Sequence, residues 1–215
     1  MIRRFAKTED GTAMVEMAIV STLLFALTLG FVDFGYALYQ WNSATKAVQI
    51  GGRLASISDP VVTNLAAAAP IATPGAPIVA GAYGPFVCKY SGTTGACSNG
   101  GTFDATNFSR IFRGDTAVTN NDICPKITAA QRLTMRPGMC HFFPGLRRDN
   151  IVITYAATGL GYQTRLGGPV PTITVSLQNM TYQFFFLGGL FGLGDMTMPS
   201  MLSTVTGEDL KSTSP

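Results

Sequence analysis

The chain has 215 residues, of which only 13% are charged, and its net charge is +3. A soluble globular domain averages about 25% charged residues, so this deficit needs a cause. The Lys and Arg residues are scattered and form no basic stripe, which argues against nucleic-acid binding. The one histidine, His141, excludes a His-rich metal centre and leaves a single candidate base for a hydrolytic triad.

An apolar run from Thr12 to Val32 follows a short basic leader. The charges that make the leader basic are Arg3, Arg4 and Lys7. At a rise of about 1.5 Å per residue the run spans about 31 Å, close to the hydrocarbon thickness of about 30 Å, so it predicts a membrane helix. The positive-inside rule places the N-terminus in the cytoplasm, and everything after Asp33 is then exported.

Glu16 is the only charge in this run and lies one turn inside it. An ionisable side chain costs about 2.5–3.5 kcal/mol at the centre of a membrane helix and less near its ends. Glu16 could simply reach back to the cytoplasmic headgroups. However, Gly11 lies five residues earlier, at the boundary of the leader, so cleavage after Gly11 would make Thr12 the first residue and Glu16 the fifth.

This arrangement resembles the leader of type IV pilins, and more specifically the N-terminus of the TadE-like proteins of tight-adherence (Flp) pilus systems. The family pattern is a Gly, small residues, Val-Glu, an apolar span, an acidic residue with Phe-Gly, a Tyr and a later Arg. The positions that match it are Gly11, Val15, Glu16, Asp33, Phe34, Gly35, Tyr39 and Arg53.

The resemblance implies cleavage between Gly11 and Thr12 by a prepilin peptidase. It also implies that Glu16 faces the freed amino group of Thr12, in the same chain or in a neighbouring subunit. The expected partners are other pilus subunits, minor pseudopilins and inner-membrane lipid, and the expected role is a minor pseudopilin that primes, caps or anchors the filament. The expected location is the bacterial inner membrane, with a single pass and a periplasmic C-terminal domain, or the pilus after processing.

The N-terminus has two other possible interpretations. An ordinary secretory signal would need small residues at its cleavage site, and residues 30–36 offer no good site. An uncleaved single-pass anchor that presents a ligand-binding or adhesive domain is the alternative function.

The helical period continues beyond Asp33, so we expect a stem helix over residues 34–58 that ends before Pro60. Gly51 and Gly52 could kink or fray it. An apolar stripe is expected to pack on the exported domain or on partner subunits; it comprises Phe34, Ala37, Leu38, Trp41, Ala44, Val48 and Ala55.

The predicted order of segments is a leader (1–11), a membrane helix (12–33), the stem helix (34–58) and an exported α+β domain (59–215). Residues 59–85 predict a helical turn near 64–69 and an extended connector, and residues 88–144 predict loops with one short helix at 129–135. Alternating apolar residues in 151–155 and 172–177 predict an antiparallel pair joined by a long Gly-rich loop. Tyr182–Phe186 is expected to end a strand, and the apolar stretch Phe184–Leu193 is too short to span a bilayer and is expected to dock as a loop.

The exported part contains an even number of cysteines, which predicts two disulfides in an oxidising compartment; they are Cys88, Cys97, Cys124 and Cys140. Three pairings are possible, and the shorter loops favour Cys88 with Cys97 and Cys124 with Cys140. A zinc site at Cys140 and His141 is the disfavoured rival, because the chain has no C-x-x-C spacing.

No catalytic constellation, metal site or cofactor site is expected. The carboxylates in loops are read as solvated or turn-capping groups; they are Asp104, Asp115, Asp122, Asp149 and Asp195. His141 is expected to be partly buried, and Arg147 and Arg148 are expected to form a solvated turn.

Overall fold

The structure is a computed structural model of the full chain, and it describes residues 10–68, 73–116, 118–119, 121–164, 168–186, 188–189 and 196–207. The basic leader residues, Arg3, Arg4 and Lys7, lie outside the described residues, as do Asp195 and most of the stretch 187–195. The chain divides into two compact units: Met1–Gln40 with Thr181–Thr197, and Trp41–Met180 with Met198–Pro215. Each unit is described by itself.

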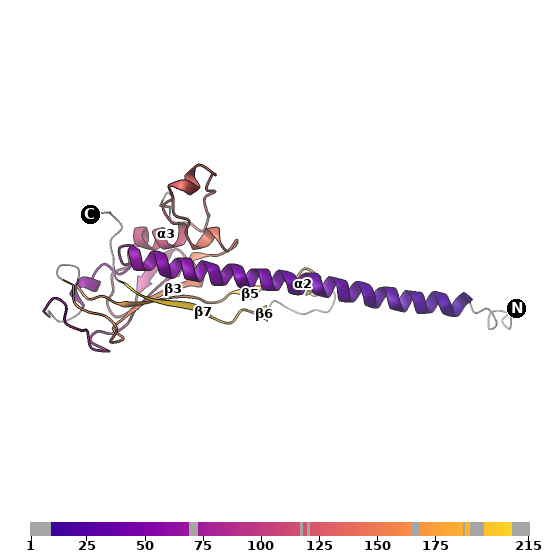
Figure 1. The fold of residues 1–215 in the computed structure, drawn as a ribbon, viewed down its shortest axis with the longest axis horizontal. Helices are drawn as coiled ribbons and strands as arrows, with labels where there is room; N and C mark the ends of the chain where they lie inside the picture. Colours follow the sequence, from indigo (N-terminus) through magenta and orange to yellow (C-terminus); the bar gives the residue numbers. More distant parts are fainter. Residues whose placement is uncertain are drawn as a thin grey trace. The chain divides into compact units, whose positions relative to one another are not determined.

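One continuous helix, α2 (Asp10–Ile57), contributes to both units (Figure 1). It begins two residues before the predicted start at Thr12 and ends at Ile57, three residues before Pro60. The predicted long N-terminal helix is therefore confirmed. The expected fraying at Gly51 and Gly52 is wrong, because helical backbone continues through both glycines.

The first unit contains the apolar half of α2 and a short antiparallel pair, β5 (Thr181–Tyr182) and β6 (Met196–Thr197). From Gly11 to Val32 no residue of the helix is buried. This part of α2 is long and apolar enough to cross a membrane.

The second unit contains a five-stranded antiparallel sheet in the order β2-β1-β3-β4-β7. Its strands are β1 (Phe86–Ser91), β2 (Thr94–Cys97), β3 (Ile151–Ala156), β4 (Thr172–Leu177) and β7 (Met201–Thr206). Pairing of β3 with β4 sets Ile153 opposite Val175 and Tyr155 opposite Ile173. The predicted antiparallel pair and the α+β class are therefore confirmed.

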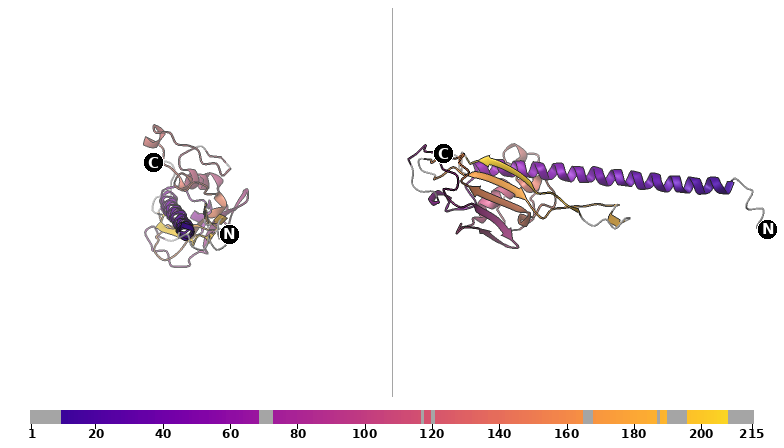
Figure 2. Two further views of the ribbon diagram at one scale, coloured as in Figure 1. Left: turned by 90° about the vertical axis from the view of Figure 1, so that its right-hand side faces the viewer. Right: turned by 90° about the horizontal axis from the view of Figure 1, so that it is seen from below.

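One face of this sheet is apolar and covered. Ile153 and Tyr155 on β3 lie on it with Ile173 and Val175 on β4, and all four are fully buried. The C-terminal part of α2 packs on this face, and Figure 2 shows it beside the strands. The opposite face is more polar, as alternation along antiparallel strands requires, and it presents Thr154, Thr174 and Thr204.

A second helix, α3 (Ala105–Arg113), also packs on the covered face. The ring of Phe108 lies 4.9 Å from that of Tyr90 on β1, between ring centroids. Asp104 caps the helix, because its Oδ1 accepts a hydrogen bond from the Asn107 N–H at 2.8 Å. The capping role read for this carboxylate is thus observed.

The expectation of a loop-rich region over 88–144 is wrong in part, because β1, β2 and α3 lie within it. The pattern in β2 is weak, since the strand Thr94–Cys97 has no residue that is fully buried. Four short 3-10 turns complete the described elements: η1 (Leu65–Ala67), η2 (Gln131–Leu133), η3 (Met139–His141) and η4 (Arg148–Asn150). Of these, η1 and η2 fall inside the predicted helical segments 64–69 and 129–135. The strand expected at Tyr182–Phe186 is limited to β5, which ends at Tyr182.

Of the expected apolar stripe along the stem, the C-terminal half is buried within the chain and the N-terminal half is exposed, which leaves packing on partner subunits as the prediction for that half. Ala44, Val48 and Ala55 are buried, whereas Phe34, Leu38 and Trp41 are exposed. The residues buried along α2 include polar and small ones: Asp33, Gln40, Ser43, Ala44, Ala47, Val48, Gly51, Gly52, Leu54 and Ala55. The small side chains let the helix approach the rest of the second unit closely.

Gly51 marks the tightest part of this packing. A Cβ at Gly51 would lie 2.5 Å from Sδ of Met139, which is fully buried. We predict that Gly51→Ala lowers the free energy of unfolding by about 1–3 kcal/mol through overpacking, although Ala favours helix by about 1 kcal/mol. Urea unfolding of the full chain in detergent micelles, followed by near-ultraviolet circular dichroism, measures this.

The matched control is Gly35→Ala in the same helix, where a Cβ would meet nothing within 4 Å. This variant should unfold at the wild-type urea concentration or higher. Equal midpoints for the two variants would contradict close packing at Gly51.

Candidate assembly interface

The predicted processing site lies at the start of α2, where the structure leaves it open. Gly11, Thr12 and Glu16 are all exposed, and a Cβ at Gly11 would meet no heavy atom within 4 Å. Thr12 and Glu16 are four residues apart in a helix, so their side chains lie on the same face. The packing of the described residues therefore does not require a glycine at position 11. Recognition by a peptidase, and not the fold, would account for this glycine.

The helix that follows carries a continuous exposed apolar surface over residues 14–32. Its large exposed side chains are Met14, Val15, Met17, Ile19, Val20, Leu23, Leu24, Phe25, Leu27, Phe31 and Val32. Three hydroxyls in this stretch are hydrogen-bonded within the helix: those of Ser21, Thr22 and Thr28 each donate to the backbone carbonyl three residues earlier. Such a surface needs an apolar surrounding, which a bilayer or neighbouring helices would supply.

Asp33 lies where the apolar surface ends, and it is fully buried. Its Oδ1 accepts a hydrogen bond from the Phe185 N–H at 3.0 Å, and its Oδ2 accepts one from the Phe186 N–H at 2.9 Å. The carboxylate thus binds two successive backbone donors of a segment about 150 positions away in sequence. Charge-assisted hydrogen bonds of this kind are about twice as strong as neutral ones.

Gln40 binds the same segment two helical turns further on. Its Nε2 donates to the carbonyl oxygen of Gln183 at 3.1 Å, and its Oε1 accepts from the N–H of Gln183 at 3.2 Å. Between the two polar residues, the ring of Tyr36 lies 4.8 Å from that of Phe185. Residues 33, 36 and 40 thus hold the segment Gln183–Phe186, which we call the docked segment.

The other stem positions that match the TadE-like pattern remain exposed. Phe34, Gly35, Tyr39 and Arg53 lie on outward parts of α2, and the structure brings only Asp33 of the matching positions into a polar contact with the docked segment. Tyr36 and Gln40 were missed in the sequence. The spacing of seven residues between Asp33 and Gln40 on one helical face was the signal that could have revealed Gln40.

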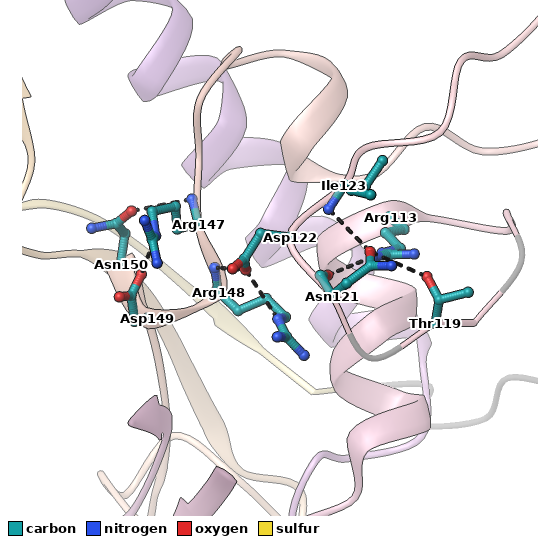
Figure 3. Close-up of polar contacts among 9 residues, drawn as sticks. All are labelled: Arg113, Thr119, Asn121, Asp122, Ile123, Arg147, Arg148, Asp149 and Asn150. Carbon is teal, nitrogen blue, oxygen red and sulfur yellow. Dashed lines mark hydrogen bonds and ion pairs between the residues drawn. The ribbon is translucent and has the colours of Figure 1, made fainter. Parts of the chain in front are cut away.

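In the second unit, two arginines hold the start of a loop that runs from Asp115 to Arg136 (Figure 3). The guanidinium of Arg113 donates to the backbone and side-chain oxygens of Asn121. Arg148 donates to Oδ1 of Asp122 from its backbone N–H and from Nε, both at 3.0 Å. The expectation of a solvated turn at Arg148 is wrong, because this side chain is buried and its guanidinium lies 4.5 Å from the Tyr90 ring centroid.

The end of the same loop is closed by Arg136. Its Nε and Nη2 each lie 2.9 Å from a carboxylate oxygen of Asp115, and this hydrogen bonding lowers the pKa of Asp115. At Asp122 burial favours the neutral acid, but the hydrogen bonds from Arg148 outweigh it and lower the pKa of Asp122. Because both pKa values are lowered, both pairs stabilise the fold above about pH 4 and lose that effect as the pH falls.

The four cysteines form two disulfides, Cys88 with Cys97 and Cys124 with Cys140, which is the pairing with the shorter loops. The first joins the paired strands β1 and β2, and the second ties the loop between Asp115 and Arg136 to η3.

The sulfur atoms of the second disulfide lie beside His141, at the place of the disfavoured zinc site. Ligand atoms of Cys124, Cys140 and His141 lie within 4.8 Å of one another, but the disulfide leaves neither cysteine a thiolate. Nδ1 of His141 accepts from the Gly138 N–H at 3.1 Å, and Nε2 donates to the Pro125 carbonyl at 2.8 Å. Both ring nitrogens are thus engaged, so the geometry fits neither a metal ligand nor a general base.

A hollow of about 710 Å³ lies over this disulfide. Its lining includes three cationic side chains, those of Lys126, Arg132 and Arg147, and one carboxylate, that of Asp122. His141 also lines it, with both ring nitrogens engaged as described, and the Asp122 carboxylate accepts hydrogen bonds from Arg148.

Comparison with known proteins adds one finding. Residues 11–53 match the family model of the TadE-like proteins, which confirms the resemblance found in the sequence. The matched residues lie within α2 and do not include the sheet. No curated protein and no solved structure matches the chain.

The ion pair between buried Arg148 and the more exposed Asp122, drawn in Figure 3, can be tested against the exposed pair of Arg147 and Asp149 beside it. We predict that Asp122→Asn lowers the free energy of unfolding by about 1.5–3 kcal/mol, because Arg148 keeps a buried charge and loses its carboxylate. The matched control is Asp149→Asn, whose partner Arg147 is exposed and lies 3.5 Å away; its cost should be about 0–1 kcal/mol. Urea unfolding of the full chain in detergent measures both, and equal costs would contradict the role given to Arg148.

Proposed function

We propose that this chain, whose residues 11–53 are TadE-like, is a subunit that acts in the assembly of a tight-adherence pilus. The observation that carries the proposal is the apolar half of α2, from which no residue between Gly11 and Val32 is buried by the rest of the chain. A pilus subunit uses such a helix twice, first as a membrane anchor and then as a contact with the helices of other subunits.

The transition between these two states would begin with cleavage after Gly11 by a prepilin peptidase. A glycine at the cut leaves the backbone free to extend in a protease cleft. Cleavage would remove Arg3, Arg4 and Lys7, the charges that hold the N-terminus in the cytoplasm. The helix could then leave the bilayer for a growing filament.

Glu16 would set the register of this assembly. Cleavage creates an ammonium group at Thr12, which lies on the same helical face as Glu16, and the carboxylate could pair with that group or with the one on a neighbouring subunit. Two opposite charges attract more strongly in an apolar surrounding than in water. The pair would therefore favour one axial offset between helices.

The proposed topology follows the same logic. Residues 1–11 would be the cytoplasmic leader, residues 12–33 the single pass through the bacterial inner membrane, residues 34–58 the stem, and residues 59–215 the periplasmic domain. The specific role would be that of a minor pseudopilin that primes, caps or anchors the filament. Its partners would be the peptidase, other pilus subunits, minor pseudopilins and membrane lipid. The proposed role is structural, with no catalytic residue assigned.

Processing and assembly can be tested together. We predict that Gly11→Leu blocks cleavage, so that the membrane form keeps Met1, whereas the wild type begins Thr-Ala-Met-Val-Glu. Glu16→Gln should be cleaved normally but fall about tenfold or more in the sheared pilus fraction, because a loss of about 1.4 kcal/mol per contact is tenfold in association. N-terminal sequencing and immunoblots of the membrane and sheared fractions give both readouts.

The control for the first substitution is Gly30→Leu, since a Cβ at either glycine meets nothing within 4 Å. The control for the second is Ser21→Ala, whose hydroxyl donates only within α2. Gly30→Leu should be processed like the wild type, and Ser21→Ala should be assembled like the wild type. Normal size and normal piliation of Gly11→Leu would favour the alternative of an uncleaved anchor that presents an adhesive domain.

A further inference from the structure

The docked segment runs along α2 toward the apolar half of the helix. Its first residue, Gln183, is bonded to Gln40, and its last residue, Phe186, is bonded to Asp33. A helix rises about 10 Å over seven residues, and three steps of extended chain cover about 10 Å. The segment therefore lies extended beside the helix, and its direction leads to the apolar surface over residues 14–32.

Asp33 fixes the level of this segment relative to the apolar run. It follows directly on the run from Thr12 to Val32, whose length of about 31 Å matches a hydrocarbon core. Phe185 and Phe186 are bonded to Asp33 through their backbone, so they lie where the run ends. This step rests on the proposed function, because only a membrane-spanning α2 turns that position into a bilayer boundary.

The side chains exposed at this level are largely aromatic. Phe185 is 62% exposed and Phe186 is 41% exposed, and the helix near Asp33 also carries the exposed rings of Phe31, Phe34 and Tyr39. Aromatic side chains are enriched where membrane proteins cross the headgroup region. In water these rings would form an exposed apolar patch.

Several backbone polar groups of the docked segment form hydrogen bonds with the helix. The two N–H groups at Phe185 and Phe186 donate to Asp33, and the backbone of Gln183 is paired with the Gln40 amide. Unpaired backbone groups and an unpaired carboxylate would each be costly near hydrocarbon. Their mutual pairing leaves the rings of Phe185 and Phe186 exposed, and no residue from 182 to 194 is charged.

We propose that the docked segment, Gln183–Phe186, is a second membrane-contacting element. It places the rings of Phe185 and Phe186 at the boundary between the headgroups and the acyl chains of the periplasmic leaflet. Asp33 and Gln40 are the positioning residues that hold it there. The element sets the depth at which α2 rests in the bilayer before assembly.

The test uses tryptophan fluorescence of the full chain in vesicles of phosphatidylethanolamine and phosphatidylglycerol. The sole tryptophan, Trp41, is replaced by Phe, and Phe185→Trp supplies the probe, with Phe186→Trp as a second probe. Lipids brominated high on the acyl chain should quench the probe, and aqueous iodide should quench it weakly. Adding Asp33→Asn should reduce the lipid quenching about threefold or more, because it removes two charge-assisted hydrogen bonds.

Two reference positions separate this inference from the proposed function. Leu24→Trp should be quenched by lipids brominated deep in the acyl chain, and Leu202→Trp, exposed on β7, should be quenched by iodide. If Leu24→Trp is not quenched by lipid, the membrane span itself fails. If Leu24→Trp is quenched by lipid while the probes at 185 and 186 are open to iodide, the inference alone is overturned. Shielding of both probes from iodide and from lipid alike would mean contact with another subunit, and would also overturn it.

Discussion

The structure depends on one constraint, which is that α2 carries an apolar surface that the described part of the chain leaves exposed. From Gly11 to Val32 no residue is buried, whereas Trp41–Ile57 packs small residues against a sheet. A helix of this kind can exist only with a bilayer or other helices around its first half. Three proposed features relate to this surface. Cleavage would let it leave the bilayer, Glu16 would set its register against other helices, and the docked segment would set its depth in the membrane.

The polar residues on α2 are understood through the same constraint. Asp33 and Gln40 lie on a helix face that would otherwise be apolar, and each is satisfied by backbone groups of Gln183–Phe186 rather than by water. An acidic residue at the end of the run thus has a structural partner within the chain. Glu16 is different, because it lies exposed within the run, and its proposed partner is created only when the leader is removed.

In the second unit, a few ion pairs bind the ends of a long loop. Arg148 is buried against Tyr90 and bonded to Asp122, and Arg136 forms two hydrogen bonds with Asp115. These pairs and the disulfide of Cys124 and Cys140 hold a long loop in which none of the described residues is buried. The ion pairs and the disulfide therefore hold the loop in place without the burial of its own apolar side chains.

The sequence predicted those features that depend on local pattern. The length of α2, the alternation in β3 and β4 and the family of residues 11–53 follow from periodicity and motif, and the structure or the comparison confirms them. The helix face buried around Asp33 could not be predicted, because its partner lies about 150 residues away and binds through backbone atoms. Arg148 was misread for a similar reason: a charged pair of residues in a turn predicts exposure, and only the distant Asp122 and Tyr90 make burial favourable.

The most direct test of the account asks whether the apolar half of α2 is covered in the cell. The native cysteines form disulfides, so Leu24→Cys supplies a single thiol in the exposed apolar surface, and Thr94→Cys supplies one at an exposed site on β2. Spheroplasts are treated with a membrane-impermeant maleimide, with and without prior dissolution in detergent. We predict that Thr94→Cys is labelled in both conditions and Leu24→Cys only after denaturing detergent. Equal labelling of the two variants in intact spheroplasts would contradict the account.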